Sequence, residues 1–83
     1  DPIFDSITVH FNHILSQQYP GTHIHDLRMV PGENVVNLVF DVAVPPECKD
    51  TAPLTEQLSR AAKALDPRYR CIIHYDLDFY NEQ

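Results

Sequence analysis

One stretch in the middle of the chain decides its fold: Val35-Val36-Asn37-Leu38-Val39-Phe40-Asp41-Val42-Ala43-Val44. Alternate positions of this stretch form an unbroken apolar set: Val36, Leu38, Phe40, Val42 and Val44. Successive side chains of a β-strand point to opposite faces, so this period of two predicts a strand with one face in the core. We expect the other face, which carries Asn37, Val39 and Asp41, to point away from the core.

The elements around this strand follow from similar patterns. Asp1-Pro2 is typical of a helix start, and apolar residues then recur at three- and four-residue spacing up to the break at Pro20-Gly21. Asp66-Pro67 closes a second amphipathic helix. The remaining expected elements are a strand from about Thr22 to Val30, a turn at Pro31-Gly32-Glu33-Asn34, a helix from about Pro53 to Leu65 and a strand from Tyr69 to about Phe79.

The resulting order is α-β-β-α-β, in a single domain over residues 1–83. It predicts an α+β fold of the ferredoxin-like type, with a three-stranded sheet and both helices on one face. A right-handed crossover from the second strand to the third would put the first strand in the middle, as in a split βαβ arrangement. Nothing in the chain is then left to cover the opposite face of the sheet.

The last predicted strand carries a His-x-Asp pair, His74 and Asp76, on the face opposite its apolar set. Residues two apart in a strand share a face about 6.5–7 Å apart, so an imidazole and a carboxylate at this spacing can both reach one ion. Asp41 belongs to the same uncovered face. His25 completes the candidate metal ligands. The face on which His25 stands is ambiguous, because the apolar residues Leu27 and Met29 occupy alternate positions along the same strand. We therefore place His25 at the start of the strand.

Twelve Asp and Glu residues against six Lys and Arg give the chain a net charge of −6. This charge argues against nucleic acid and anionic lipid surfaces as partners, and it suits both cations and ordinary solubility. No run approaches the roughly eighteen apolar residues of a membrane span, so no direct membrane insertion is expected. Cys48 and Cys71 fit no disulfide framework. No nucleophile has an adjacent base, so we expect no enzyme activity.

Three segments together resemble the C-terminal cytoplasmic domain of cation diffusion facilitator (cation efflux) transporters: Ile24-His25-Asp26-Leu27-Arg28, Asn37-Leu38-Val39-Phe40-Asp41-Val42-Ala43-Val44-Pro45 and Ile72-Ile73-His74-Tyr75-Asp76. The resemblance implies a metallochaperone-like fold and a V-shaped homodimer. It also implies a place on the cytoplasmic side of the cell membrane, below a six-helix membrane domain of the same chain, and a regulatory role in which zinc or similar ions favour closure of the V. Because the chain begins on a helix start without an initiating Met, we expect a fragment of a longer transporter.

The resemblance also implies a set of ligands. The family's cytoplasmic ligands fall on His25, His74 and Asp76, and Asp41 stands where the family often has His. A fourth family ligand falls near Ala52, which cannot bind metal, so the resemblance implies one site per subunit. Two imidazoles and two carboxylates favour zinc, with cobalt, cadmium, iron or manganese tolerated, whereas calcium and magnesium prefer all-oxygen shells.

Other residues and other functions stay open at this point. His23 is expected at the surface, His10 and His13 share a face of the first helix, and Cys48 offers a thiolate. The chain could instead be a free-standing metallochaperone or metal-buffering protein, or a ferredoxin-like dimerisation module without metal. For dimerisation we expect the uncovered sheet face and the end of the last strand, whose apolar residues are Ile72, Leu77, Phe79 and Tyr80.

Overall fold

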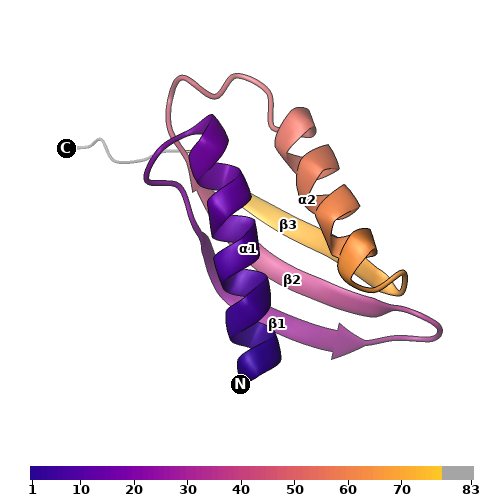
Figure 1. Cartoon of the computed structure of the whole chain (residues 1–83). Helices are drawn as coiled ribbons and strands as arrows, with labels where there is room; N and C mark the ends of the chain where they lie inside the picture. Colours follow the sequence, from indigo (N-terminus) through magenta and orange to yellow (C-terminus); the bar gives the residue numbers. More distant parts are fainter. Residues whose placement is uncertain (78–83) are drawn as a thin grey trace.

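The computed structural model describes residues 1–77 and has five elements in the order α-β-β-α-β (Figure 1). Their bounds are α1 Pro2–Gln18, β1 Ile24–Pro31, β2 Val36–Val44, α2 Ala52–Leu65 and β3 Tyr69–Leu77. Both helices lie on one face of a three-stranded mixed sheet, which confirms the predicted α+β class. Phe79 and Tyr80, expected at the end of the last strand, lie outside the described residues.

Helix α1 forms where its sequence supplies both a cap and an apolar stripe. The Asp1 carboxylate accepts a hydrogen bond from the Ile3 backbone N–H (2.8 Å), which satisfies one of the free donors at the helix start. Four-residue spacing then brings one apolar face inward, and three of its residues are buried: Ile7, Phe11 and Leu15. The helix ends at Tyr19, whose backbone is extended.

Helix α2 covers the other half of the sheet. Asp50 accepts a hydrogen bond from the Ala52 backbone N–H (3.0 Å), and the four-residue repeat of Leu54, Leu58 and Ala62 is buried. Together with α1 and the apolar face of β2, this stripe forms one core, in which the rings of Phe11 and Phe40 meet at 5.6 Å between centroids. The predicted inward parity of β2 is therefore confirmed.

The strand order differs from the prediction. The order is β1-β2-β3, so β2 is central and β1 lies at an edge, whereas we expected the first strand in the middle. Helix α2 connects β2 to the parallel strand directly beside it, and no strand is inserted between them. The most apolar strand thus takes the most buried place. Strand β1 ends in Pro31 and carries an irregularity near His25, both of which suit an edge.

The irregularity in β1 is a β-bulge that reverses the parity of the strand. His25 pairs with Asp41 and Arg28 pairs with Val39, so two residues of β1, Asp26 and Leu27, stand against one residue of β2. Asp26 takes up the extra residue in a left-handed conformation, with φ of 56°. Because of the bulge, Ile24 before it and Leu27 after it both face the core, while His25 stays exposed. This resolves the ambiguity of the sequence pattern.

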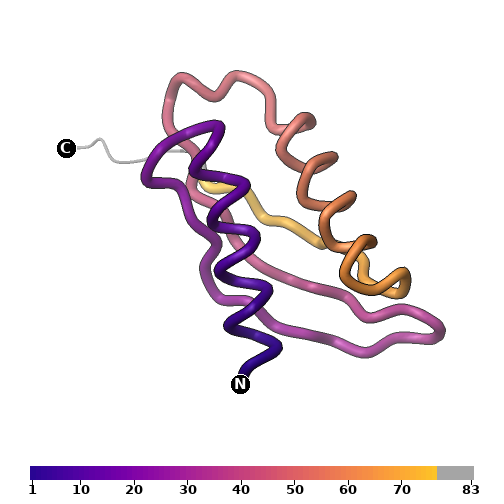
Figure 2. The backbone as a smooth tube through the Cα atoms, in the orientation of Figure 1, coloured from indigo at the N-terminus to yellow at the C-terminus, as the bar shows by residue number. Residues whose placement is uncertain are grey.

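The backbone trace places the β1–β2 hairpin turn at the same end of the molecule as the connection from α2 to β3 (Figure 2). A hydrogen bond from the Val36 N–H to the Arg68 carbonyl (2.8 Å) ties these two segments together. Within residues 1–77, no helix is both long and apolar enough to cross a membrane. No segment within the described range covers the sheet face opposite the helices (Figure 1).

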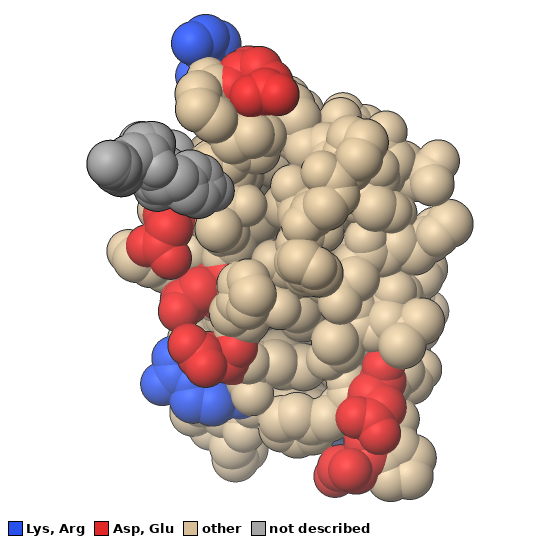
Figure 3. Space-filling model, turned by 90° about the vertical axis from the view of Figure 1, so that its left-hand side faces the viewer, with Lys and Arg blue, Asp and Glu red and all other residues tan. Residues whose placement is uncertain are grey.

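Charges that are spread along the sequence gather at the surface. In the side view of the space-filling structure, Asp and Glu side chains form a column down one edge, with Lys or Arg at both of its ends, and a second acidic group lies at the lower right (Figure 3). The surface between the column and this second group is uncharged in this view. The excess of acidic residues therefore produces a local negative field, which raises the concentration of cations nearby.

Candidate metal centre

Three of the four predicted ligands stand in one row across the outer face of the sheet. The register pairs His25 with Asp41 on β1 and β2, and Asp41 with His74 on β2 and β3. Asp76 follows two residues after His74 and so shares its face. The row depends on the parity of β2 and β3, which was predicted. It also depends on the bulge in β1 and on the direct pairing of β2 with β3, neither of which was predicted.

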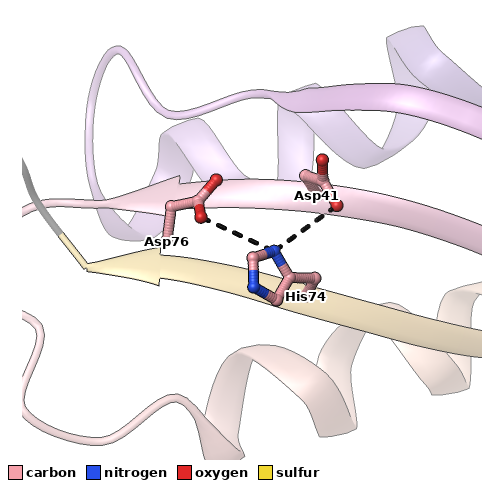
Figure 4. Close-up of side chains that lie close together, drawn as sticks. All are labelled: Asp41, His74 and Asp76. Atoms are coloured by element: carbon pink, nitrogen blue, oxygen red, sulfur yellow. Dashed lines mark ion pairs between the residues drawn. The ribbon is translucent and has the colours of Figure 1, made fainter.

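Asp41, His74 and Asp76 form a compact group (Figure 4). The Nδ1 atom of His74 lies 3.5 Å from Asp76 Oδ1 and 3.7 Å from Asp41 Oδ1, and the ligand atoms of all three residues lie within 4.8 Å of one another. Ligand atoms at about 2.0–2.1 Å around a tetrahedral zinc ion are about 3.3 Å apart. Small rotations of side chains are therefore sufficient to bring all three onto one ion.

The group is open to solvent. The side chain of His74 is 71% exposed, Asp76 is more than half exposed and Asp41 is half-buried. Without an ion, a protonated His74 forms two solvent-screened pairs with the carboxylates, each worth no more than about 1 kcal/mol. An ion that replaces the proton interacts with both carboxylates at shorter distance, and the exposed side leaves room for water or a fourth protein ligand.

His25 stands beside this group and outside it. It is opposite Asp41 in the ladder, but it does not belong to the group whose ligand atoms converge. Its ring instead lies against the ring of His23, at 5.7 Å between centroids in an edge-to-face arrangement. The structure thus brings Asp41, His74 and Asp76 together and leaves His25 next to His23.

The remaining candidates lie elsewhere. His10 and His13 are exposed on α1, which covers the opposite face of the sheet from the group of three. Cys48 is buried and donates from its thiol to the Asp50 carbonyl (3.6 Å). Burial raises the pKa of Cys71 to about 11, so its thiol stays protonated at neutral pH and is a poor ligand. Both cysteines are free.

One residue that matters for the site was not predicted from the sequence. Asp26 places His25 on the outer face by adopting a positive φ, which few residues other than Gly do readily. The sequence does contain a sign of the irregularity at Asp26. Ile24 and Leu27 are both apolar, but they are three residues apart, and an unbroken strand would place their side chains on opposite faces of the sheet. A bulge is the simplest backbone feature that removes this conflict.

Comparison of the chain with protein-family models, with curated proteins and with solved structures finds no significant match. The fold and the site define a small α+β domain with a candidate metal-binding group on the sheet face opposite the helices.

Proposed function

We propose that this chain is a regulatory cytoplasmic domain of a divalent cation efflux transporter, which binds a zinc-type ion and forms a homodimer. The observation that carries the proposal is the group of Asp41, His74 and Asp76, whose ligand atoms lie within 4.8 Å on a sheet face that no described segment covers. The motifs around these residues are those that resemble the cation diffusion facilitator family. The group shares His74 and Asp76 with the ligands that the resemblance implies, whereas His25 lies outside it and Asp41 stands where the family often has His.

The donor set supports a zinc-type ion over calcium or magnesium. One imidazole and two carboxylates make a mixed shell, which zinc, cobalt, iron and manganese accept. Three protein ligands leave at least one position for water or for a group from a second subunit. In the transporter family that the motifs resemble, an ion in this region favours closure of the dimer, and an open coordination position suits that role.

The outer sheet face also suits a second subunit. Ile72 on β3 is 49% exposed and Val30 on β1 is 45% exposed, and both stand on the same face as the candidate metal group. Val39 lies between them on β2, opposite Ile72 in the register. Exposed apolar side chains that share a face are typical of interaction surfaces.

The two features combine into a mechanism. The carboxylates of Asp41 and Asp76 on facing surfaces repel each other, so the apo subunits stay apart where these residues lie. An ion bound by Asp41, His74 and Asp76 neutralises that charge and lets the surfaces approach. The ion shifts the equilibrium only as far as it binds the closed form better than the open form, and a tenfold preference amounts to about 1.4 kcal/mol.

Zinc titration by calorimetry tests the proposal, with sedimentation to follow the oligomer. We expect the double change His74→Ala and Asp76→Ala to weaken zinc binding by at least tenfold. The matched control is Asp5→Ala with His13→Ala, which removes the same residue types from exposed positions of α1. A wild-type chain that binds no zinc and dimerises would be a dimerisation module, and one that binds zinc as a monomer would be a metal buffer. Either result would overturn the proposal.

A further inference from the structure

We infer that His23 and His25 form a second metal-ion position, separate from the group of Asp41, His74 and Asp76, at a hollow in the outer sheet face above Ala43. This inference does not rest on the proposed function. The position takes a transition-metal ion that favours imidazole, such as Ni²⁺, Cu²⁺ or Zn²⁺.

The separation of the two imidazoles fits one ion. His23 and His25 are two residues apart in extended chain at the start of β1, so they share a face, and their ring centroids are 5.7 Å apart. Two imidazoles that bind one ion through nitrogen at about 2.0–2.1 Å place their centroids about 4.5–5.2 Å apart, for coordination angles between 90° and the tetrahedral value. The rings therefore stand close to the required distance, and a small approach together with a rotation brings them onto one ion.

A hollow of about 290 Å³ lies beside the two rings. Its lining consists of Pro20, Gly21, Thr22, His23, His25, Ala43 and Pro45. The floor is formed in part by Ala43, which follows Asp41 by two residues on the outer face of β2 and whose methyl group leaves space that a larger side chain would fill. The hollow gives an ion at the rings room for its remaining water ligands.

Thr22 adds a buried polar residue to the lining of the hollow. It is 7% exposed, and its hydroxyl is both a donor and an acceptor of hydrogen bonds. A water ligand on an ion at the two rings is a suitable partner for such a group.

The two positions differ in chemistry. The pair His23 and His25 offers nitrogen alone, whereas the group around His74 is richer in carboxylate oxygen. Nitrogen-only sites favour nickel, copper and zinc, and carboxylates widen the choice toward manganese. Asp41 stands opposite His25 in the ladder and belongs to the other group, so the two ions would be neighbours on the sheet. We therefore expect two binding events per chain with different selectivity.

The test is calorimetric titration with nickel(II) chloride at pH 7.5, together with NMR of the histidine rings. We expect His23→Ala to weaken one nickel-binding event by at least tenfold, and Ala43→Leu, which fills the hollow without removing a ligand, to weaken the same event. His13→Ala removes an exposed imidazole on α1 and is the matched control. In the wild type, substoichiometric Ni²⁺ should broaden the ring signals of His23 and His25 before those of His10 and His13.

The variant with His74→Ala and Asp76→Ala separates this inference from the proposed function. We expect it to keep the nickel-binding event that His23→Ala removes, and to lose only the other site. The inference is overturned if His23→Ala binds nickel as the wild type does, or if His13→Ala weakens binding as much. It is also overturned if the His74 and Asp76 changes abolish all nickel binding, since there would then be one site. Circular dichroism confirms that each variant is folded before it is titrated.

Discussion

His25 lies directly opposite Asp41 in the β1–β2 ladder, on the outer face of the sheet, because one extra residue bulges from β1 immediately after it. Without the bulge, a strand that keeps Leu27 and Met29 toward the core would turn His25 inward as well. The backbone of one non-ligand residue, Asp26, thus decides on which side of the sheet an imidazole stands.

The first prediction concerns the backbone at Asp26, whose φ is 56°. A β-branched residue is strongly disfavoured there, so Asp26→Val should lower the free energy of unfolding by about 1–2 kcal/mol. Asp26→Gly removes the same carboxylate, but glycine adopts this conformation without strain, so its stability should stay within about 0.5 kcal/mol of wild type. Urea unfolding measures both. Equal losses in the two variants would mean that the charge, and not the backbone, is what matters.

A second prediction tests which face of β2 is the core. Phe40 is fully buried against Phe11, so Phe40→Ala should cost about 3–5 kcal/mol and unfold much of the protein at 37 °C. Val39→Ala, one residue earlier on the outer face, should cost much less, about 1 kcal/mol or below. Thermal unfolding followed by circular dichroism compares them. A larger loss for Val39→Ala would show that the outer face is covered in solution, for example by a second subunit.

These features also explain how far the sequence alone could predict the structure. Helices and strands followed from local periods, and the outward positions of Asp41 and His74 followed from parity, because both depend on neighbours along the chain. The place of β3 depends on which edge of the hairpin is free to accept it. Pro31, which lacks an N–H, and the bulge at Asp26 mark β1 as the edge, but the bulge is visible in the sequence only as a conflict of parity.

The candidate site was predictable only in part. His74 and Asp76 share a face by spacing, but their approach to Asp41 requires that β2 and β3 be neighbours, whereas the predicted order placed the first strand between them. The pairing of His25 with His23 depends on side-chain orientation at an irregular strand end, where no period applies. The hollow above Ala43 depends on a loop, Pro20 to Thr22, whose course over the sheet follows from tertiary packing.

A third prediction concerns thiol reactivity. Burial raises the pKa of Cys71 to about 11, and its thiol donates to the Leu58 carbonyl (3.8 Å). Since the thiolate is the reactive form, Cys71 in a Cys48→Ser background should react with iodoacetamide at pH 8.5 on the order of 10- to 100-fold more slowly when folded than in denaturant. The folded protein should also lose stability as the pH rises from about 9 toward 11, because the unfolded thiol ionises first. Rapid labelling of the folded protein would place Cys71 at the surface.

A fourth prediction concerns metal and pH. Ligand imidazoles must be neutral and ligand carboxylates ionised, so protons compete with the ion. Zinc at about 100 times its dissociation constant should stabilise the fold by roughly 2.7 kcal/mol, and the melting temperature should rise clearly at pH 7.5 and much less at pH 5.5. Differential scanning calorimetry with and without zinc measures the shift. An equal rise at both pH values would exclude His74 as a ligand.

The last prediction concerns the proposed dimer. A spin label at Gln17→Cys, an exposed position on α1, reports the distance between subunits once Cys48 and Cys71 are replaced by Ser. If the ion relieves repulsion between facing carboxylates, zinc should shorten the mean distance and narrow its distribution, and 1 M salt without zinc should do so in part, because salt screens the same repulsion. The variant with His74→Ala and Asp76→Ala should respond less than the unchanged chain to both zinc and salt, since it lacks one carboxylate and the imidazole of the group. Zinc-driven closure that persists in this variant would instead assign the switch to another site, and the pair of His23 and His25 would be the first to test by the change His23→Ala.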